Sequence, residues 1–193
     1  QVVLVTAGSR GVGRAIALRL AEAGADLVVN FAHARPDADA VAGRIADLGR
    51  RVAEVQADLT EPDDLATMLD WIGTTFGRLD LVVCNVPAGP ATPLLATTPA
   101  DFDVAMQRGV RPLILLAQHA TDLLARCPGG GQIVAVGRAT GKTGLNPTQS
   151  AALSRTVEHL AEELAPRGVR VNALLGGEAA PETIADTVLL LAS

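Results

Sequence analysis

The sequence predicts an α/β domain in which a doubly wound parallel sheet lies between two layers of helices, a three-layer αβα arrangement. Apolar, β-branched runs alternate with helical patterns from one end of the chain to the other. These predicted strands cover 2–6, 27–31, 51–56, 79–84, 132–136 and 170–174. The 193 residues are 49% hydrophobic but only 2% aromatic, and this aliphatic composition is typical of a parallel sheet buried on both faces. No linker or repeat interrupts the series, so we predict one domain over 1–193.

Local patterns predict two helix starts and one packing face. The stretches T-E-P-D from Thr60 and T-P-A-D from Thr98 each offer a threonine cap, an early proline and an acid in the first turn. The first helix carries Val12, Ile16 and Leu20 on one stripe, which we expect to pack on the sheet. An unbroken series of strand–helix units favours right-handed crossovers between parallel strands.

The composition excludes several classes of function. A net charge of −5 and a pI near 5.1 argue against nucleic acid as a partner. No apolar run approaches the ~20 residues of a membrane span, and Arg10 and Arg14 interrupt the place where a signal peptide would be apolar. Cys84 and Cys127 suffice for neither a disulfide framework nor a metal cluster. We therefore expect a cytoplasmic chain with no membrane, nucleic-acid or metal partner.

A glycine-rich turn, T-A-G-S-R-G-V-G from Thr6, joins the first predicted strand to the first predicted helix. At that position, backbone N–H groups and the positive end of the helix can approach a pyrophosphate, as in a dinucleotide-binding Rossmann fold. The alternative is a tight packing turn that binds no ligand. The residues expected at the phosphates are Gly8, Ser9, Arg10, Gly11, Val12 and Gly13.

The end of the second predicted strand bears on the choice of cofactor. An NAD site places an acid there, ~20 residues after the glycines, to bind the ribose hydroxyls. The segment from Asn30, another expected cofactor residue, to Arg35 contains no carboxylate, and the next acid is Asp37. Arg10 and Arg35 can instead meet a 2′-phosphate, although Arg35 can equally be a solvated loop charge. We predict a preference for NADP(H) over NAD(H).

Four segments resemble the short-chain dehydrogenase/reductase family, and together they extend over nearly the whole chain. The glycine turn matches the family's T-G-x-x-x-G-x-G, with Ala7 at the first glycine. The stretch A-D-L at 57–59 matches the segment whose aspartate reaches the adenine, which assigns Asp58 and Leu59 to the cofactor. The run L-D-L-V-V-C-N at 79–85 matches the fourth strand and assigns Asn85. The run at 163–173 is close to the sixth-strand signature. The motif sequences most resemble those of 3-oxoacyl and enoyl carrier-protein reductases.

The resemblance also implies where the catalytic residues should stand. The family uses a tyrosine as proton donor, a lysine that lowers its pKa and holds the ribose, a serine beside the carbonyl and an asparagine in a proton relay. Counting forward from the fifth strand places Arg138 at the serine, Ala151 at the tyrosine and Arg155 at the lysine. The asparagine falls on Gly109. With the longer tyrosine-to-lysine spacing of enoyl reductases, the tyrosine falls on Thr148 instead.

The chain contains no tyrosine at all, and its only lysine is Lys142. Alanine donates no proton and arginine keeps its own, so the catalytic tetrad is interpreted as degenerate in either alignment. Loss of a general acid typically costs ~10²- to 10⁴-fold in rate. The remaining candidates for a substitute are poorly acidic hydroxyls, scattered histidines and a cysteine expected to pack in the core, namely Thr148, Ser150, Ser154, His33, His119, His159 and Cys84.

Three hypotheses follow for the function. The first is a protein that binds NADP(H) without the family's hydride chemistry and acts as a binding or partner subunit. The second is an NADPH-dependent reductase of a keto or enoyl thioester that uses protons from substrate or water. The third is a non-redox enzyme in which Arg138 and Arg155, with Lys142 nearby, grip an anionic small molecule.

Assembly and completeness can also be predicted from the resemblance. The family pairs two long helices across a two-fold axis, here roughly 99–125 and 149–164. The second carries Val157, Leu160 and Leu164 at helical spacing, so we expect a homodimer or tetramer, or a heterodimer with an intact relative. After the glycine pair at 176–177, the substrate-covering loop and final strand that the resemblance implies are missing from this sequence.

Overall fold

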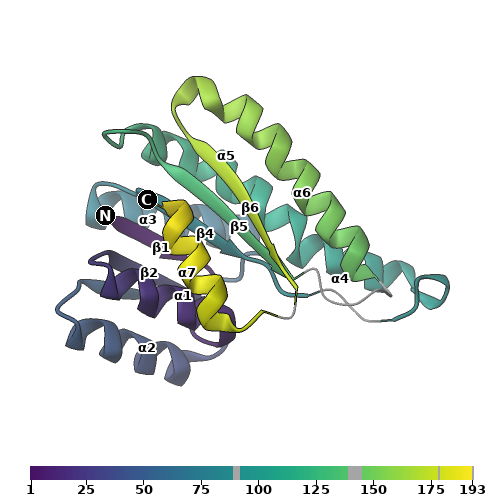
Figure 1. Ribbon diagram of the computed structural model, residues 1–193, viewed down its shortest axis with the longest axis horizontal. Coiled ribbons are helices and arrows are strands. Elements are labelled where there is room, and N and C mark those ends of the chain that lie inside the picture. The colour runs from purple at the N-terminus through teal and green to yellow at the C-terminus, as the bar shows by residue number, and fades with distance from the viewer. Residues whose placement is uncertain (89–91, 139–144, 178, 193) are drawn as a thin grey trace.

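The computed structural model describes residues 1–88, 92–138, 145–177 and 179–192, and it has the predicted three-layer architecture (Figure 1). The central sheet of the described residues has six parallel strands in the order β3-β2-β1-β4-β5-β6. The strands are β1 (Val2–Val5), β2 (Asp26–Phe31), β3 (Val52–Gln56), β4 (Leu81–Asn85), β5 (Gln132–Arg138) and β6 (Arg170–Gly176). The strand order reverses direction between β1 and β4, which opens a crevice at the carboxyl ends of these two strands.

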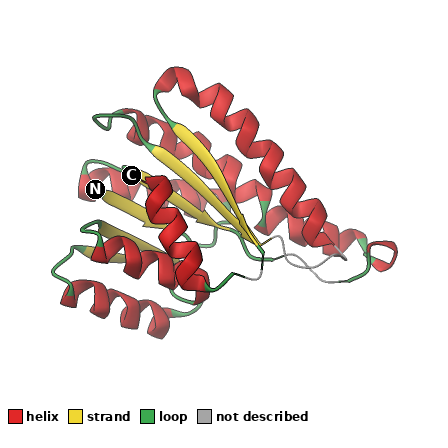
Figure 2. Ribbon diagram, viewed as in Figure 1, coloured by secondary structure: helices red, strands yellow, loops and turns green. Residues whose placement is uncertain are grey.

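Helices cover both faces of the sheet (Figures 1 and 2). One face packs on α1 (Gly11–Glu22), α2 (Arg35–Asp47) and α7 (Pro181–Ala192). The other packs on α3 (Pro62–Phe76), α5 (Val110–Ala125) and α6 (Leu145–Leu164). Helix α4 (Pro99–Arg108) extends beyond the sheet, and the short helices η1 (Leu94–Ala96) and η2 (Ala165–Arg167) connect longer elements.

The two cores are built from aliphatic side chains, as the composition predicted. The stripe predicted for the first helix is confirmed, because Ile16 and Leu20 are buried and half-buried Val12 packs against the same cluster. The predicted threonine cap at Thr98 is also confirmed. Its hydroxyl accepts a hydrogen bond from the Asp101 N–H, and the Asp101 carboxylate accepts one from the Thr98 N–H at 3.0 Å, forming a capping box.

The cap predicted at Thr60 is wrong. Helix α3 begins at Pro62 with Glu61 as its N-cap, and the Glu61 side chain makes no capping bond. The N–H and the hydroxyl of Thr60 both donate to Asp58 Oδ1, at 2.9 and 2.8 Å. An acid two residues upstream therefore holds the threonine in a local turn, which competes with its role as a helix cap.

The long helix predicted over 99–125 is broken at Gly109, which has φ −100° and ψ −80°. The Gln149 side chain of α6 reaches into the break, where its Nε2 donates to the Ala105 carbonyl oxygen at 2.9 Å. A Cβ at position 109 would collide with the Gln149 amide and would lie 2.7 Å from the Ala105 oxygen. The absence of a side chain at Gly109 thus makes room for Gln149.

The apolar residues proposed for a dimer surface lie inside the chain's own core. Val157 and Leu164 are buried, and half-buried Leu160 packs against the same cluster. Helix α6 runs along β5 and β6 and uses this stripe to cover the sheet. The expected oligomer stays a prediction, but these three residues no longer support it.

Two features are absent from the described residues. None of their helices is both long and apolar enough to cross a bilayer. Nor do they bring together three or more His, Cys, Asp or Glu side chains that could hold a metal ion.

The contact at the helix break predicts a measurable stability effect. Gln149→Ala removes the donor from the buried Ala105 carbonyl and should lower the free energy of unfolding by about 1–3 kcal/mol. Denaturant titration measures this change, and Gln118→Ala at an exposed site of α5 is the matched control, expected within ~0.5 kcal/mol of the parent.

Gly109→Asn should also destabilise the chain because its side chain and Gln149 require the same space. Combining it with Gln149→Ala should relieve part of that cost, which a double-mutant cycle detects. Fully additive effects would contradict the steric coupling.

Candidate functional site

A cavity of about 260 Å³ opens at the carboxyl ends of β1, β2 and β4, beside the crevice between β1 and β4. Its walls come from the glycine turn, the segments that follow β2 and β3, the end of β4, and the helices α4 and α5. Four of the predicted cofactor residues line it: Asn30, Asp58, Leu59 and Asn85. The topology therefore brings together residues that lie far apart in the sequence.

The glycine turn packs so closely against the sheet that side chains are excluded at two positions. A Cβ at Gly8 would lie 3.0 Å from the Val5 carbonyl oxygen, and one at Gly13 would collide with the Ala7 carbonyl. Ala7 itself has φ +47°, in the left-handed region that favours glycine. The predicted turn leads directly into α1, whose first N–H groups have no partner inside the helix.

The carboxamide of buried Asn30 holds this turn in place. Its Nδ2 donates to the Ala57 carbonyl at 3.0 Å and its Oδ1 accepts from the Ala7 N–H at 3.3 Å. The Asn30 carbonyl accepts from the Gly8 N–H at 2.9 Å. Asn30, expected to contact the cofactor, therefore contributes to the cavity wall while its amide bonds to the backbone.

A second brace joins β1 to β4, because the Thr6 hydroxyl oxygen accepts from the Asn85 N–H at 2.9 Å. The two braces fix the turn to strands on both sides of β1. Asn85 is thereby held at the cavity, and a Cβ at Gly13 would lie only 2.9 Å from its Nδ2.

Asp58 presents a carboxylate to the cavity. Hydrogen bonds from the backbone and then the hydroxyl of Thr60 lower the pKa of this carboxyl, and burial only partly opposes them. The nearby positive charges of His33 and Arg108 lower the pKa further. Asp58 is therefore ionised at neutral pH, and because Thr60 uses only Oδ1, the second oxygen remains available to a ligand.

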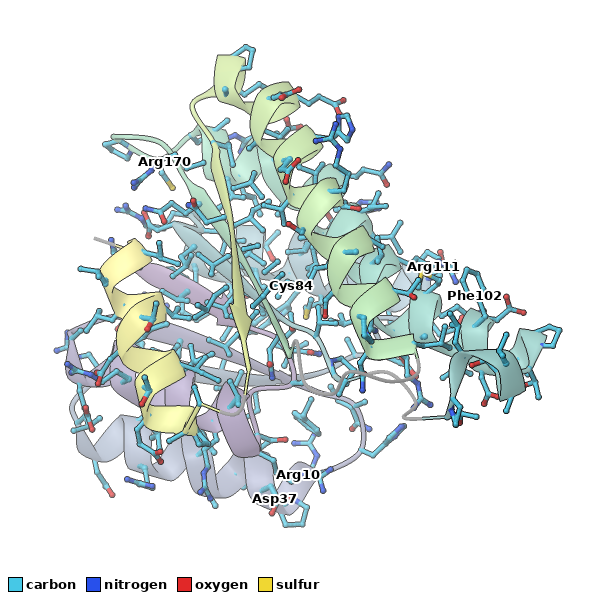
Figure 3. The ribbon with its side chains drawn as sticks, turned by 45° about the vertical axis from the view of Figure 1, so that its right-hand side comes forward. Arg10, Asp37, Cys84, Phe102, Arg111 and Arg170 are labelled. Atoms are coloured by element: carbon cyan, nitrogen blue, oxygen red, sulfur yellow. The ribbon has the colours of Figure 1, made fainter. Side chains whose placement is uncertain are left out.

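The two arginines predicted to bind a 2′-phosphate do not line the described part of the cavity. Arg10 pairs with Asp37 at 3.2 Å and its side chain is 68% exposed. Figure 3 shows this pair at the rim of the molecule, well apart from Cys84 in the interior. Arg35 lies 3.9 Å from Asp39 and its guanidinium stacks 5.0 Å from the Phe31 ring centroid.

Two other basic residues, His33 and Arg108, line the cavity instead, and the sequence assigned neither of them to the cofactor. His33 is the second residue after β2, at the sheet edge where the carboxyl ends of the parallel strands meet. Because ligands bind at that edge, its position in the sequence could have identified it as a cavity residue. Arg108 is the last residue of α4. Its position at the end of a helix could not be predicted, because the sequence predicted one uninterrupted helix over 99–125.

Helix α6 turns the residues counted to the tyrosine and lysine positions away from the rest of the chain. The helix buries Leu145, Asn146, Gln149, Leu153 and Val157 against the rest of the chain. Ala151 and Arg155, together with Thr148, are exposed. Arg155 pairs with Glu158 on the solvent side of the helix, so it is not brought to the cavity as a ribose anchor or as half of an arginine pair.

The residues four apart on the inner face of α6 are Asn146, which is 6% exposed, and half-buried Ser150. The count forward from β5 assumed that segment 139–144 has the length usual in the family. A difference of one residue in that length shifts every later assignment by ~100° around the helix. The apolar spacing of Leu145, Leu153 and Val157 was the signal that could have identified this face.

The backbone of Arg138 ends β5 opposite Gly176. Its side chain and the whole of Lys142 lie outside the described residues.

Cys84, considered as a nucleophile, is buried among core side chains where it lines the cavity (Figure 3). Burial raises the pKa of its thiol to about 12. The thiolate form is therefore negligible at neutral pH, which agrees with the prediction of a packing cysteine.

A reversing strand order, a tight glycine turn into the first helix and a cavity at the switch point define a dinucleotide-binding α/β domain. The family description Enoyl-(Acyl carrier protein) reductase matches residues 6–180. The chain is 34% identical over 178 residues to hydroxynaphthalene reductase arp2 of Aspergillus fumigatus, which covers 90% of this chain and 64% of that protein. It is 32% identical over 180 residues to a 3-oxoacyl-[acyl-carrier-protein] reductase of Staphylococcus aureus, covering 90% and 72%.

Solved structures of dehydrogenases share the fold of this chain. A short-chain dehydrogenase of Burkholderia cenocepacia J2315 in complex with NADP is 30% identical, with a TM-score of 0.87 over 99% of this chain and 89% of that one. A hydroxysteroid dehydrogenase of Escherichia coli is 25% identical, with a TM-score of 0.90 over 100% and 89%. This chain belongs to the short-chain dehydrogenase/reductase family. It spans 64% of the length of the Aspergillus reductase and of 1-cyclohexenylcarbonyl-CoA reductase of Streptomyces collinus.

The left-handed backbone at Ala7 predicts a stabilising substitution. Ala7→Gly removes a steric cost of about 1 kcal/mol and should raise the thermal midpoint by ~2–4 °C. Gly11→Ala is the converse control, since Gly11 has φ +51° with open space around it and should be destabilised by a methyl group. A lower midpoint for Ala7→Gly would show that the turn does not strain the alanine.

The buried thiols predict chemical inertness. At about pH 8, a thiol with a pKa near 12 is ionised in roughly one molecule in 10⁴, and burial also raises the pKa of Cys127. The native chain should therefore not react with a disulfide-forming thiol reagent, whereas both cysteines should react in denaturant. Rapid labelling of the native chain, abolished by Cys84→Ala, would indicate an activated Cys84.

Proposed function

We propose that this chain binds NADP(H) in the described cavity and does not perform the hydride transfer typical of its family. The observation that carries this proposal is the absence of any tyrosine from the sequence, together with the side chains on the inner face of α6. The degenerate tetrad is thus proposed with its tyrosine and lysine positions moved to Asn146 and Ser150. Gly109 keeps the asparagine position.

The residues present fit a dinucleotide. Bare backbone at Gly8 and Gly13 allows close approach of phosphates to the start of α1, and the braces from Thr6 and Asn30 hold that backbone in place. The cavity beside Leu59 suits an adenine ring, with the free oxygen of Asp58 as acceptor for its amino group. The relatives solved with NADP support this assignment of the cavity.

A bound nicotinamide cofactor would supply hydride, but reduction of a carbonyl also needs a proton. Asn146 offers a carboxamide, and its Oδ1 is buried without a hydrogen-bond partner among the described residues. That oxygen accepts hydrogen bonds, and an amide N–H is not an acid at neutral pH. The Gln149 amide is bonded to the Ala105 carbonyl, where it closes the helix break rather than relaying protons.

A second candidate is an NADPH-dependent reductase of a keto or enoyl thioester that takes its proton from water or substrate. The matching description of carrier-protein reductases and the reductases among the relatives favour it. Electrostatic stabilisation by one well-placed donor is worth ~3 kcal/mol, so such a route would be slow without a general acid. The arginine-pair hypothesis is not carried further, because Arg155 faces solvent and pairs with Glu158.

One experiment separates the two candidates. Calorimetric titration with NADPH and NADH should show saturable binding with tighter NADPH. NADPH absorbance in the presence of acetoacetyl and crotonyl thioesters should then stay at the protein-free baseline, with a Staphylococcus aureus 3-oxoacyl reductase as positive control. Steady oxidation of NADPH that requires this protein would establish the reductase instead. No binding of either cofactor would reject both proposals.

A paired set of variants tests the proposed register of the catalytic positions on α6. Asn146→Tyr with Ser150→Lys places a proton donor and a cation on the inner face of α6, whereas Ala151→Tyr with Arg155→Lys places them on the outer face. Any gain in NADPH oxidation is expected in the first pair alone. A gain confined to the second pair would restore the alignment counted from the fifth strand.

A further inference from the structure

The geometry points to His33, assisted by Arg108, as the group that distinguishes NADP(H) from NAD(H) by binding the 2′-phosphate. This inference rests on the proposed binding of the cofactor in the cavity. It replaces the two arginines that sequence reasoning assigned to the phosphate, and it makes the choice of cofactor depend on an imidazole.

The positions of the candidate cations carry the first step. His33 and Arg108 both line the cavity together with Asp58. His33 follows β2, and Arg108 is the last residue of α4. Both act on the Asp58 carboxylate, whose pKa they lower. Arg10 and Arg35 do not line the described cavity, and each has an acid partner on α2.

The local charge balance carries the second step. The charged residues that line the cavity with His33 are Asp58 after β3 and Arg108 on α4. Arg10 and Arg35 are instead paired with Asp37 and Asp39 on α2. Within each α2 pair the opposite charges offset one another. Among the described residues of the cavity lining, the charge of Asp58 offsets that of Arg108, so the lining is neutral overall with an uncharged imidazole and positive with a protonated one. A phosphate dianion is attracted to the second state and not to the first.

The identity of the cation then determines the pH dependence. An imidazole ordinarily titrates between about pH 5 and pH 8, whereas a guanidinium stays charged throughout that range. If His33 contacts the 2′-phosphate, the preference for NADPH over NADH should weaken as pH rises. If Arg10 or Arg35 makes the contact, the preference should not change over the same interval.

The experiment measures dissociation constants of NADPH and NADH at constant ionic strength from about pH 6 to about pH 8. The ratio of the two constants cancels contributions from the shared pyrophosphate, adenine and nicotinamide. In the parent chain the preference for NADPH should fall about tenfold over this range, because a charge-assisted contact to phosphate is lost.

Three variants make the test specific. His33→Ala should bind NADH as the parent does but should lose most of its preference for NADPH at low pH. His33→Arg should keep the preference and lose its fall with pH, and it corrects for the second ionisation of the phosphate itself near pH 6. His119→Ala, an exposed histidine of α5 remote from the cavity lining, is the matched control and should behave as the parent.

The failure of this inference is distinguishable from failure of the proposed function. If His33→Ala keeps a pH-dependent preference, or if Arg10→Ala or Arg35→Ala alone abolishes it, His33 is not the phosphate-binding group although the cofactor still binds. If neither dinucleotide binds the parent chain, the proposed function is wrong and the inference fails with it.

Discussion

The carboxamide of Asn30 is the contact on which the glycine turn and the cavity both depend. One buried side chain joins the segments that follow β1 and β3, and the Asn30 carbonyl fixes Gly8 in the same turn. Each of these groups would cost ~1–3 kcal/mol if it were buried without a partner. The brace therefore lets an irregular turn pack closely on the sheet, and it also explains why Asn30 contributes a wall to the cavity rather than a free ligand.

The break between α4 and α5 is likewise held by a buried side-chain amide. Gly109 leaves space that the Gln149 amide fills, and that amide satisfies the Ala105 carbonyl at the end of α4. Leu153 and Val157 meanwhile keep α6 packed on the sheet. The packing that positions α6 thus depends on its buried apolar side chains and on the Gln149 amide.

Sequence patterns predicted the elements well where one local force dominates. Each strand of the sheet lies within about two residues of its predicted range, because aliphatic runs buried on both faces leave a continuous signal. The break at Gly109 was missed because helical periodicity continues on both sides of it. The cap at Thr60 was mispredicted because Asp58, two residues earlier, competes for its hydroxyl. At the site, Asp58, Leu59 and Asn85 were found from motifs, whereas His33 and Arg108 belong to no motif.

The sequence by itself determined the order of strands and helices, the glycine turn between β1 and α1, and the lack of a tyrosine to donate a proton. Those properties depend on residue type and short spacing, which the chain carries before it folds. Only the tertiary structure decided which side chains line the cavity, which pack against the rest of the chain and which face solvent. Helical phase on α6 turned Ala151 and Arg155 outward and Asn146 inward, and acids on α2 drew Arg10 and Arg35 into pairs at the rim. Such choices depend on contacts between distant segments, because burial and charge pairing exist only once the segments meet.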